Sequence, residues 1–162
     1  MKTNTHSRYA AARRWLIFWT LFIGLGALGG SLGMLLDPTG KSMGMDAMLP
    51  FFKKLPFADI LFQDFTFSGI ALLLVNGLPN LLAAGLLLGR KPQGTVLGGV
   101  LGITLMLWIC IQFYMFPPNF MDTAYFLFGL AQALTGYAAW VFARQEAFAA
   151  EQRTYPHVGQ DP

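Results

Sequence analysis

Two asparagines in the middle of a long apolar run are the residues whose type and spacing most suggest a binding site. Asn76 and Asn80 lie within residues 65–88, FTFSGIALLLVNGLPNLLAAGLLL. Residues four apart share one face of a helix, so both amides point the same way. An amide both donates and accepts hydrogen bonds, and polar groups at the middle of a bilayer often mark a site. The pair therefore predicts a polar pocket for a ligand headgroup or a small solute.

Pro79, between the two asparagines, predicts a local distortion of this helix. Proline has no amide hydrogen and its ring collides with the carbonyl of Val75, so the helix should bend or open there. Gly77 makes such a distortion easier. Carbonyls freed in lipid need partners, which the side chains of Asn76 and Asn80 could supply.

Three further uncharged polar residues extend the candidate ligand-binding site. Thr104 and Gln132 fall at a depth similar to that of the asparagines, and Gln112 lies about 10 Å above Thr104 along its helix. If packing brings them together with Asn76 and Asn80, the five residues line one site. The alternative is that the amides only tie helices together, each hydrogen bond contributing roughly 0.6 to 2 kcal/mol.

No other residue pattern predicts catalysis or a cofactor. His6 and His157 lie near the two ends of the chain, so neither can ligate a haem or metal ion inside the apolar runs. The one cysteine, Cys110, has no basic neighbour and reads as a small buried hydrophobe. We therefore expect no catalytic residue, no metal ligand and no cofactor, and the sequence favours a non-enzymatic protein.

The elements that carry these residues are four long apolar runs. The chain has 162 residues, of which 55% are hydrophobic and 12% charged, outside the usual range of soluble proteins. About 20 apolar residues in a helix cross the hydrocarbon core of a bilayer. We predict an all-α membrane protein with four transmembrane helices in one antiparallel bundle, residues 15–142. The predicted spans are residues 15–36, 65–88, 95–116 and 122–142.

The segment between the first two spans, residues 37–64, is too polar to cross a membrane but is rich in methionine, leucine and phenylalanine. Its large apolar side chains alternate with lysines and aspartates, which is typical of a segment lying in the headgroup region. We predict one or two short helices, broken at Pro50 and Pro56, that cover the bundle as a lid. An ordinary loop outside the membrane is the alternative.

The distribution of positive charge predicts the topology. Eight lysines and arginines fall in the tails and the short connection between the second and third spans, and three fall in residues 37–64. Positive residues accumulate on the cytoplasmic side, so the tails, residues 1–14 and 143–162, should be cytoplasmic in a multi-pass inner (plasma) membrane protein. The eight are Lys2, Arg8, Arg13, Arg14, Arg90, Lys91, Arg144 and Arg153; the three are Lys41, Lys53 and Lys54.

One long segment and two short sequence runs, in this order along the chain, resemble those of a known group of proteins. The run VNGL at 75–78, the later run WICIQ at 108–112 and the long proline-broken segment after the first span resemble small uncharacterised bacterial four-helix membrane proteins. More weakly, residues 15–142 resemble the DoxX-like architecture. The resemblance implies a bacterial inner membrane and carries over no activity and no site residues.

Two functions remain open at this point. The first is an accessory subunit or a lipid- or quinone-type ligand-binding protein, with membrane lipid, other membrane subunits or further copies of itself as partners. The second is a small oligomeric transporter or channel. Nucleic acid is not an expected partner, because the positive residues flank the apolar runs and form no basic face with interleaved aromatics.

The topology can be tested with the variant Ser42→Cys. We expect an impermeant thiol reagent added to intact cells to label this cysteine, because residues 37–64 should lie outside, and the parent chain with Cys110 alone serves as the control. Labelling that appears only after the inner leaflet is made accessible would show that the topology is reversed.

Overall fold

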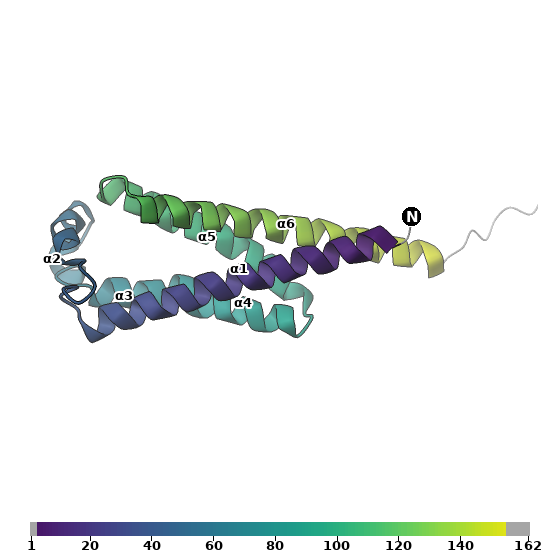
Figure 1. Cartoon of the computed structure of the whole chain (residues 1–162), viewed down its shortest axis with the longest axis horizontal. Helices are drawn as coiled ribbons and strands as arrows, with labels where there is room; N and C mark the ends of the chain where they lie inside the picture. The colour runs from purple at the N-terminus through teal and green to yellow at the C-terminus, as the bar shows by residue number, and fades with distance from the viewer. Residues whose placement is uncertain (1–2, 155–162) are drawn as a thin grey trace, which may run out of the picture.

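The computed structural model describes residues 3–154, and within these residues it contains helices and no strand (Figure 1). The elements are α1 (Thr3–Leu36), the 3₁₀ helix η1 (Asp46–Lys54), α2 (Ala58–Leu61), α3 (Thr66–Leu72), the π-helix η2 (Leu73–Gly77), α4 (Leu78–Leu88), α5 (Pro92–Met115) and α6 (Phe120–Thr154). The four predicted spans are confirmed as helices long and apolar enough to cross a membrane: Ser7–Leu36, Thr66–Leu88, Pro92–Met115 and Phe120–Gln152.

The first and last helices continue into the predicted tails. α1 already begins at Thr3, and α6 continues to Thr154. The extension of α6 consists largely of alanine, arginine, glutamine and glutamate, and half of the extension of α1 is alanine and arginine, all residues of high helix propensity. Neither extension contains glycine or proline. The remaining tail residues, 1–2 and 155–162, lie outside the described part of the chain.

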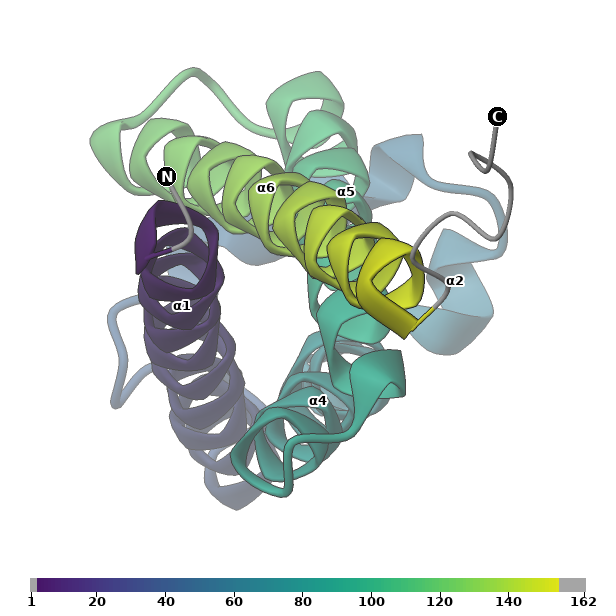
Figure 2. The ribbon, with the colours of Figure 1, turned by 90° about the vertical axis from the view of Figure 1, so that its right-hand side faces the viewer.

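Viewed from the end, α1, α4 and the pair formed by α5 and α6 lie on three sides of the bundle (Figure 2). α5 packs along α6, α1 packs against α6 on one side and against α3, η2 and α4 on the other, and α4 contacts α5. Glycines set the closest approach: a Cβ added to Gly102 of α5 would lie 2.6 Å from the carbonyl oxygen of Gly129 in α6. α5 and α6 therefore meet backbone to backbone at this level.

The predicted distortion near Pro79 is present as the π-helix η2. The amide N–H of Leu78 donates to the carbonyl of Leu73, five residues back, and Pro79 follows at the start of α4. Single π-turns of this kind insert one residue into a helix and are frequent at functional sites. Thr66–Leu88 is thus one membrane-length helix with a change of phase in its middle.

Residues 37–64, which we call the lid segment, lie across one end of the long helices (Figure 1). Phe52 of η1 is buried and packs against three rings, Phe62, Phe65 and Phe116. The ammonium group of Lys54 donates to the carbonyl of Met115, 3.0 Å away, at the end of α5. Hydrophobic contact and a helix-capping charge therefore both hold the lid segment in place.

The prediction that Pro50 breaks the lid segment is wrong. Pro50 lies inside η1, whereas Pro56 does separate η1 from α2. The fixed φ of proline, near −65°, also suits a 3₁₀ helix, so Pro50 needs no break there.

The lid segment starts from a turn organised by Asp37. Its carboxylate accepts hydrogen bonds from the Thr39 hydroxyl at 2.6 Å, the Ser42 amide at 2.7 Å and the Thr39 amide at 3.1 Å. The bonds from Thr39 and Ser42 hold the pKa of Asp37 well below its usual range. Asp37 is thereby committed to ending α1 and is charged at neutral pH.

Candidate functional site

Three buried amides form a network where the second span passes the third and fourth. The side-chain nitrogen of Gln132 in α6 donates to Oδ1 of Asn80 and to the carbonyl of Gly98 in α5, at 2.8 Å each. The side-chain nitrogen of Asn80 donates to the carbonyl of Asn76, also at 2.8 Å. Asn76, Asn80 and Gln132 are all fully buried. We call these contacts the amide network; they join α4, α5 and α6 at one level.

Backbone groups fix the orientation of two of these amides. The carbonyls of Asn76 and Gly98 accept hydrogen bonds but cannot donate them. The nitrogen of Asn80 and the nitrogen of Gln132 must therefore face these carbonyls, and a rotation of either amide would place oxygen against oxygen. Asn80 and Gln132 are thus committed to holding helices together.

Asn76 differs from its two neighbours. Neither Oδ1 nor Nδ2 of Asn76 has a hydrogen-bond partner among the described residues, although the side chain is fully buried. Oε1 of Gln132 is the other buried side-chain atom without a partner in this part of the chain. An unpaired buried polar group costs roughly 1–3 kcal/mol, so a complete amide without partners needs an explanation.

Asn76 lines a cavity of about 580 Å³, which we call the main cavity. Its walls are apolar, with Ile23 and Ala27 from α1 facing Leu105 and Ile109 from α5. Ligand pockets are usually 300–1,000 Å³ in volume, mostly apolar, with a few polar groups that orient the ligand. The unpartnered amide therefore belongs to a space large enough to hold a small molecule.

The lid segment closes the main cavity at one end. Met43, Met45 and Met48 line it from this side, together with Phe65 at the start of the second span. Methionine is flexible and fills irregular apolar spaces, a property common at surfaces that accept differently shaped ligands. The roof of the cavity can thus adapt to its contents.

A second polar group lines the main cavity near the lid. Asn119 precedes α6 and caps it: its Oδ1 accepts from the Asp122 amide at 2.9 Å, and its nitrogen donates to Oδ2 of Asp122 at 2.6 Å. With its amide turned so that oxygen faces Trp108, Gln112 accepts from the indole nitrogen at 3.3 Å and donates to Oδ1 of Asp122 at 3.1 Å. Both carboxylate oxygens of Asp122 are then paired.

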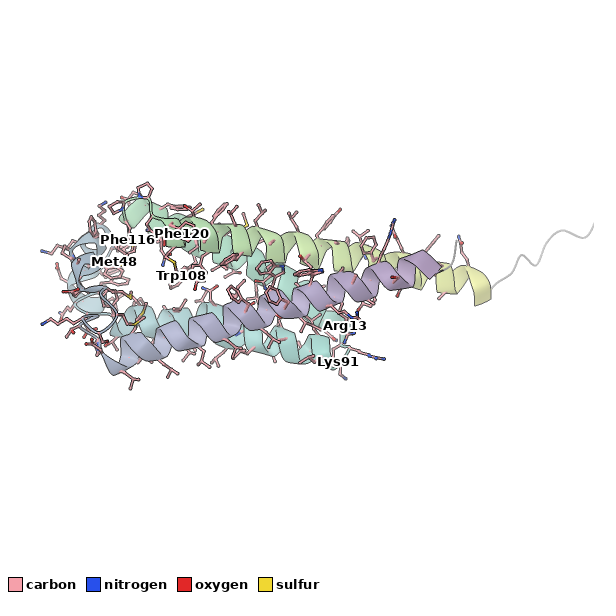
Figure 3. The ribbon with its side chains drawn as sticks, in the orientation of Figure 1. Arg13, Met48, Lys91, Trp108, Phe116 and Phe120 are labelled. Carbon is pink, nitrogen blue, oxygen red and sulfur yellow. The ribbon has the colours of Figure 1, made fainter. Side chains whose placement is uncertain are left out.

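A smaller cavity of about 370 Å³, the side cavity, adjoins the main one. The two share five lining residues: Met34, Leu72, Trp108, Gln112 and Phe116. The other side chains of the side cavity come from the lid segment, α3 and α5 and are apolar except for Ser68. Trp108 points inward from α5, behind the lid segment (Figure 3).

The structure brings together most of the predicted site residues. Asn76, Asn80 and Gln132 converge, and Gln112 lines both cavities. Thr104 lies apart: it lines neither cavity, and its hydroxyl donates to the Val100 carbonyl of its own helix at 3.2 Å.

Trp108 and Asp122 line the main cavity, although neither is among the site residues predicted from the sequence. Asn119, not Asp122, caps α6. The prediction that Cys110 is buried is wrong, because its side chain is exposed. A usable signal for Trp108 is its spacing of four residues from Gln112, which puts both side chains on one face. Within residues 3–154, no group of three or more His, Cys, Asp or Glu side chains could hold a metal ion.

Replacing Gln132 tests the structural role of the amide network. Gln132→Leu removes two hydrogen bonds and leaves Oδ1 of Asn80 buried without the donor it has in the parent chain, so we expect a loss of roughly 0.6–2 kcal/mol in the free energy of unfolding. The matched control is Thr104→Val, which removes a bond within one helix and should cost less. A reversible detergent–denaturant titration followed by circular dichroism measures both, and equal losses would contradict the role assigned to Gln132.

No protein family, curated protein or solved structure matches this chain.

Proposed function

We propose that the chain is a multi-pass protein of a bacterial inner membrane whose four spans form an antiparallel bundle with both termini in the cytoplasm. The charge count supports this orientation, because eight of the eleven lysines and arginines lie in the tails and the Gly89–Lys91 connection. Arg13 and Lys91 lie away from the lid segment, which contains Met48, whereas Phe116 and Phe120 lie beside it (Figure 3). Arg13 also donates to the Leu87 carbonyl at 2.7 Å, which stabilises the basic end.

The lid segment lies, in this proposal, in the outer headgroup region. Phe57 and Ile60 are exposed although both are large and apolar, and Lys53 and Asp59 are exposed beside them. Such a mixture suits an interface, where rings and aliphatic groups enter the lipid and charges remain in water.

The function we propose is non-enzymatic binding of a lipid-like or quinone-like molecule in the main cavity, by the protein alone or as an accessory subunit of a membrane complex. One observation carries the proposal: Asn76, whose buried amide has no partner among the described residues, lines a cavity of about 580 Å³. A ligand with a polar group would pair with this amide, and its apolar part would replace empty space along the walls.

The extent of the cavity supports binding over conduction by a single copy. Its lining residues on α5 run from Leu105 to Phe116, the half of the helix nearer the lid segment. On the other side of Asn76, the amide network and the close contact of Gly102 with Gly129 occupy the bundle. The cavity therefore has a floor, which a pore through one copy would lack.

Replacing Asn76 tests the binding function. Native mass spectrometry of gently extracted protein should show a bound molecule on the parent chain, and Asn76→Leu should insert and fold but lose it. Asn76 has no protein partner to lose, so this variant should keep more stability than Gln132→Leu. Thr104→Val, away from both cavities, is the matched control and should retain the molecule.

Two results would contradict this function. The parent chain could carry nothing beyond bulk lipid, or Asn76→Leu could retain the same molecule as well as Thr104→Val does. In either case the amides would be structural only.

A further inference from the structure

We propose that the molecule bound beside Asn76 is an uncharged single-chain amphiphile whose head both donates and accepts hydrogen bonds, such as a long-chain alcohol or primary amide. The inference rests on the proposed binding function and narrows its ligand class. It excludes heads that only accept hydrogen bonds, such as quinones and esters, as well as ionised heads.

The first argument is hydrogen-bond complementarity. Both ends of the Asn76 amide lack partners, so the site offers two donor hydrogens on Nδ2 and acceptor capacity on Oδ1. A head that only accepts would pair with Nδ2 and leave Oδ1 desolvated without a donor. Because Asn80 and Gln132 are fixed by backbone carbonyls, neither can turn a nitrogen toward Oδ1 to compensate. A hydroxyl or amide head satisfies both ends of Asn76.

The second argument is charge. Among residues 3–154, no lysine, arginine or histidine lines the main cavity, so an anionic head would be buried there without a counter-charge from this part of the chain. The one carboxylate in the lining, Asp122, already accepts hydrogen bonds from Asn119 and Gln112. Asp122 lies near the lid segment, away from Asn76. Its carboxylate is already hydrogen-bonded, so it does not require a cationic ligand head as a partner. An uncharged head fits this lining best.

The third argument is shape. From Leu105 in α5 to Phe116 just after it, the main cavity spans eleven residue steps, or about 16 Å at the helical rise. Next to its outer part lies the apolar side cavity, which shares Trp108 and Gln112 with it as lining residues. Phe57 and Phe67, which line the side cavity, are also exposed on the outside of the protein. A single chain can therefore extend from a head at Asn76 toward the surrounding lipid.

Tryptophan quenching by brominated probes tests this ligand class. Trp108 lines both cavities, so bromine at the far end of a bound chain should quench it, and the same titration of Trp108→Phe gives the background from the other tryptophans. The probes share a chain of eleven carbon atoms, in which the amide, the ester and the carboxylate include the carbonyl carbon. They are bromoundecanol, bromoundecanamide, methyl bromoundecanoate, ionised bromoundecanoate and the bromoundecyl trimethylammonium ion. All are titrated into phosphatidylcholine nanodiscs and compared at equal bilayer concentration.

We expect the alcohol and the amide to bind at least about tenfold more tightly than the methyl ester and the two ions, since one unpaired buried acceptor costs roughly that factor. Asn76→Leu should remove the preference for the alcohol and the amide over the ester, and Thr104→Val should keep it.

Equal or tighter binding of the ester or of either ion would overturn the inference while leaving the cavity as a binding site. If no probe produced quenching that depends on Trp108, the proposed function itself would be wrong, and Asn76 would be a hydrated structural amide.

Discussion

The fold depends on one constraint: buried polar groups inside a lipid-surrounded bundle must find partners in the protein. The side-chain nitrogen of Gln132 meets it by giving both hydrogens to other segments, one to Asn80 and one to the Gly98 carbonyl, whereas Oε1 of Gln132 has no partner among the described residues. This fixes α4, α5 and α6 at one level. Helix packing around that level is tight, because Gly102 and Gly129 carry no side chains to separate α5 from α6. The lining of the main cavity ends at Asn76 and Leu105, next to this level.

The opposite end of the cavity is held by different interactions. Phe52 packs into a ring cluster with Phe65 and Phe116, and Lys54 caps the last turn of α5. A hydrogen-bonded chain from Trp108 through Gln112 to Asp122 stiffens the region beneath. The main cavity therefore lies between two sets of contacts, the amide network at one end and those of the lid segment at the other. Flexible methionines in the roof are the part of this arrangement best able to move as a ligand enters.

Most of the fold was predictable from the sequence, because apolar length and the position of Pro79 have direct consequences in a bilayer. The common level of Asn80 and Gln132 was predictable as well, since it follows from counting residues along the helices. The rotation of each helix about its axis was not: the hydroxyl of Thr104 bonds within its own helix and faces neither cavity. The π-turn before Pro79 shifts the helical phase, so Asn76 and Asn80, expected to act alike, have different roles. The helical phase after such a π-turn depends on contacts between segments far apart in the sequence, which the local sequence does not reveal.

The central claim is that Asn76 is free to bind while Asn80 and Gln132 are not. The chain contains four asparagines, so selective ¹⁵N labelling gives four side-chain amide signals, which the variants Asn76→Leu and Asn80→Leu assign. Titration of undecanol into the labelled protein in nanodiscs should shift the Asn76 signal and leave that of Asn80 in place. An unmoved Asn76 signal, or equal shifts of both, would contradict the account.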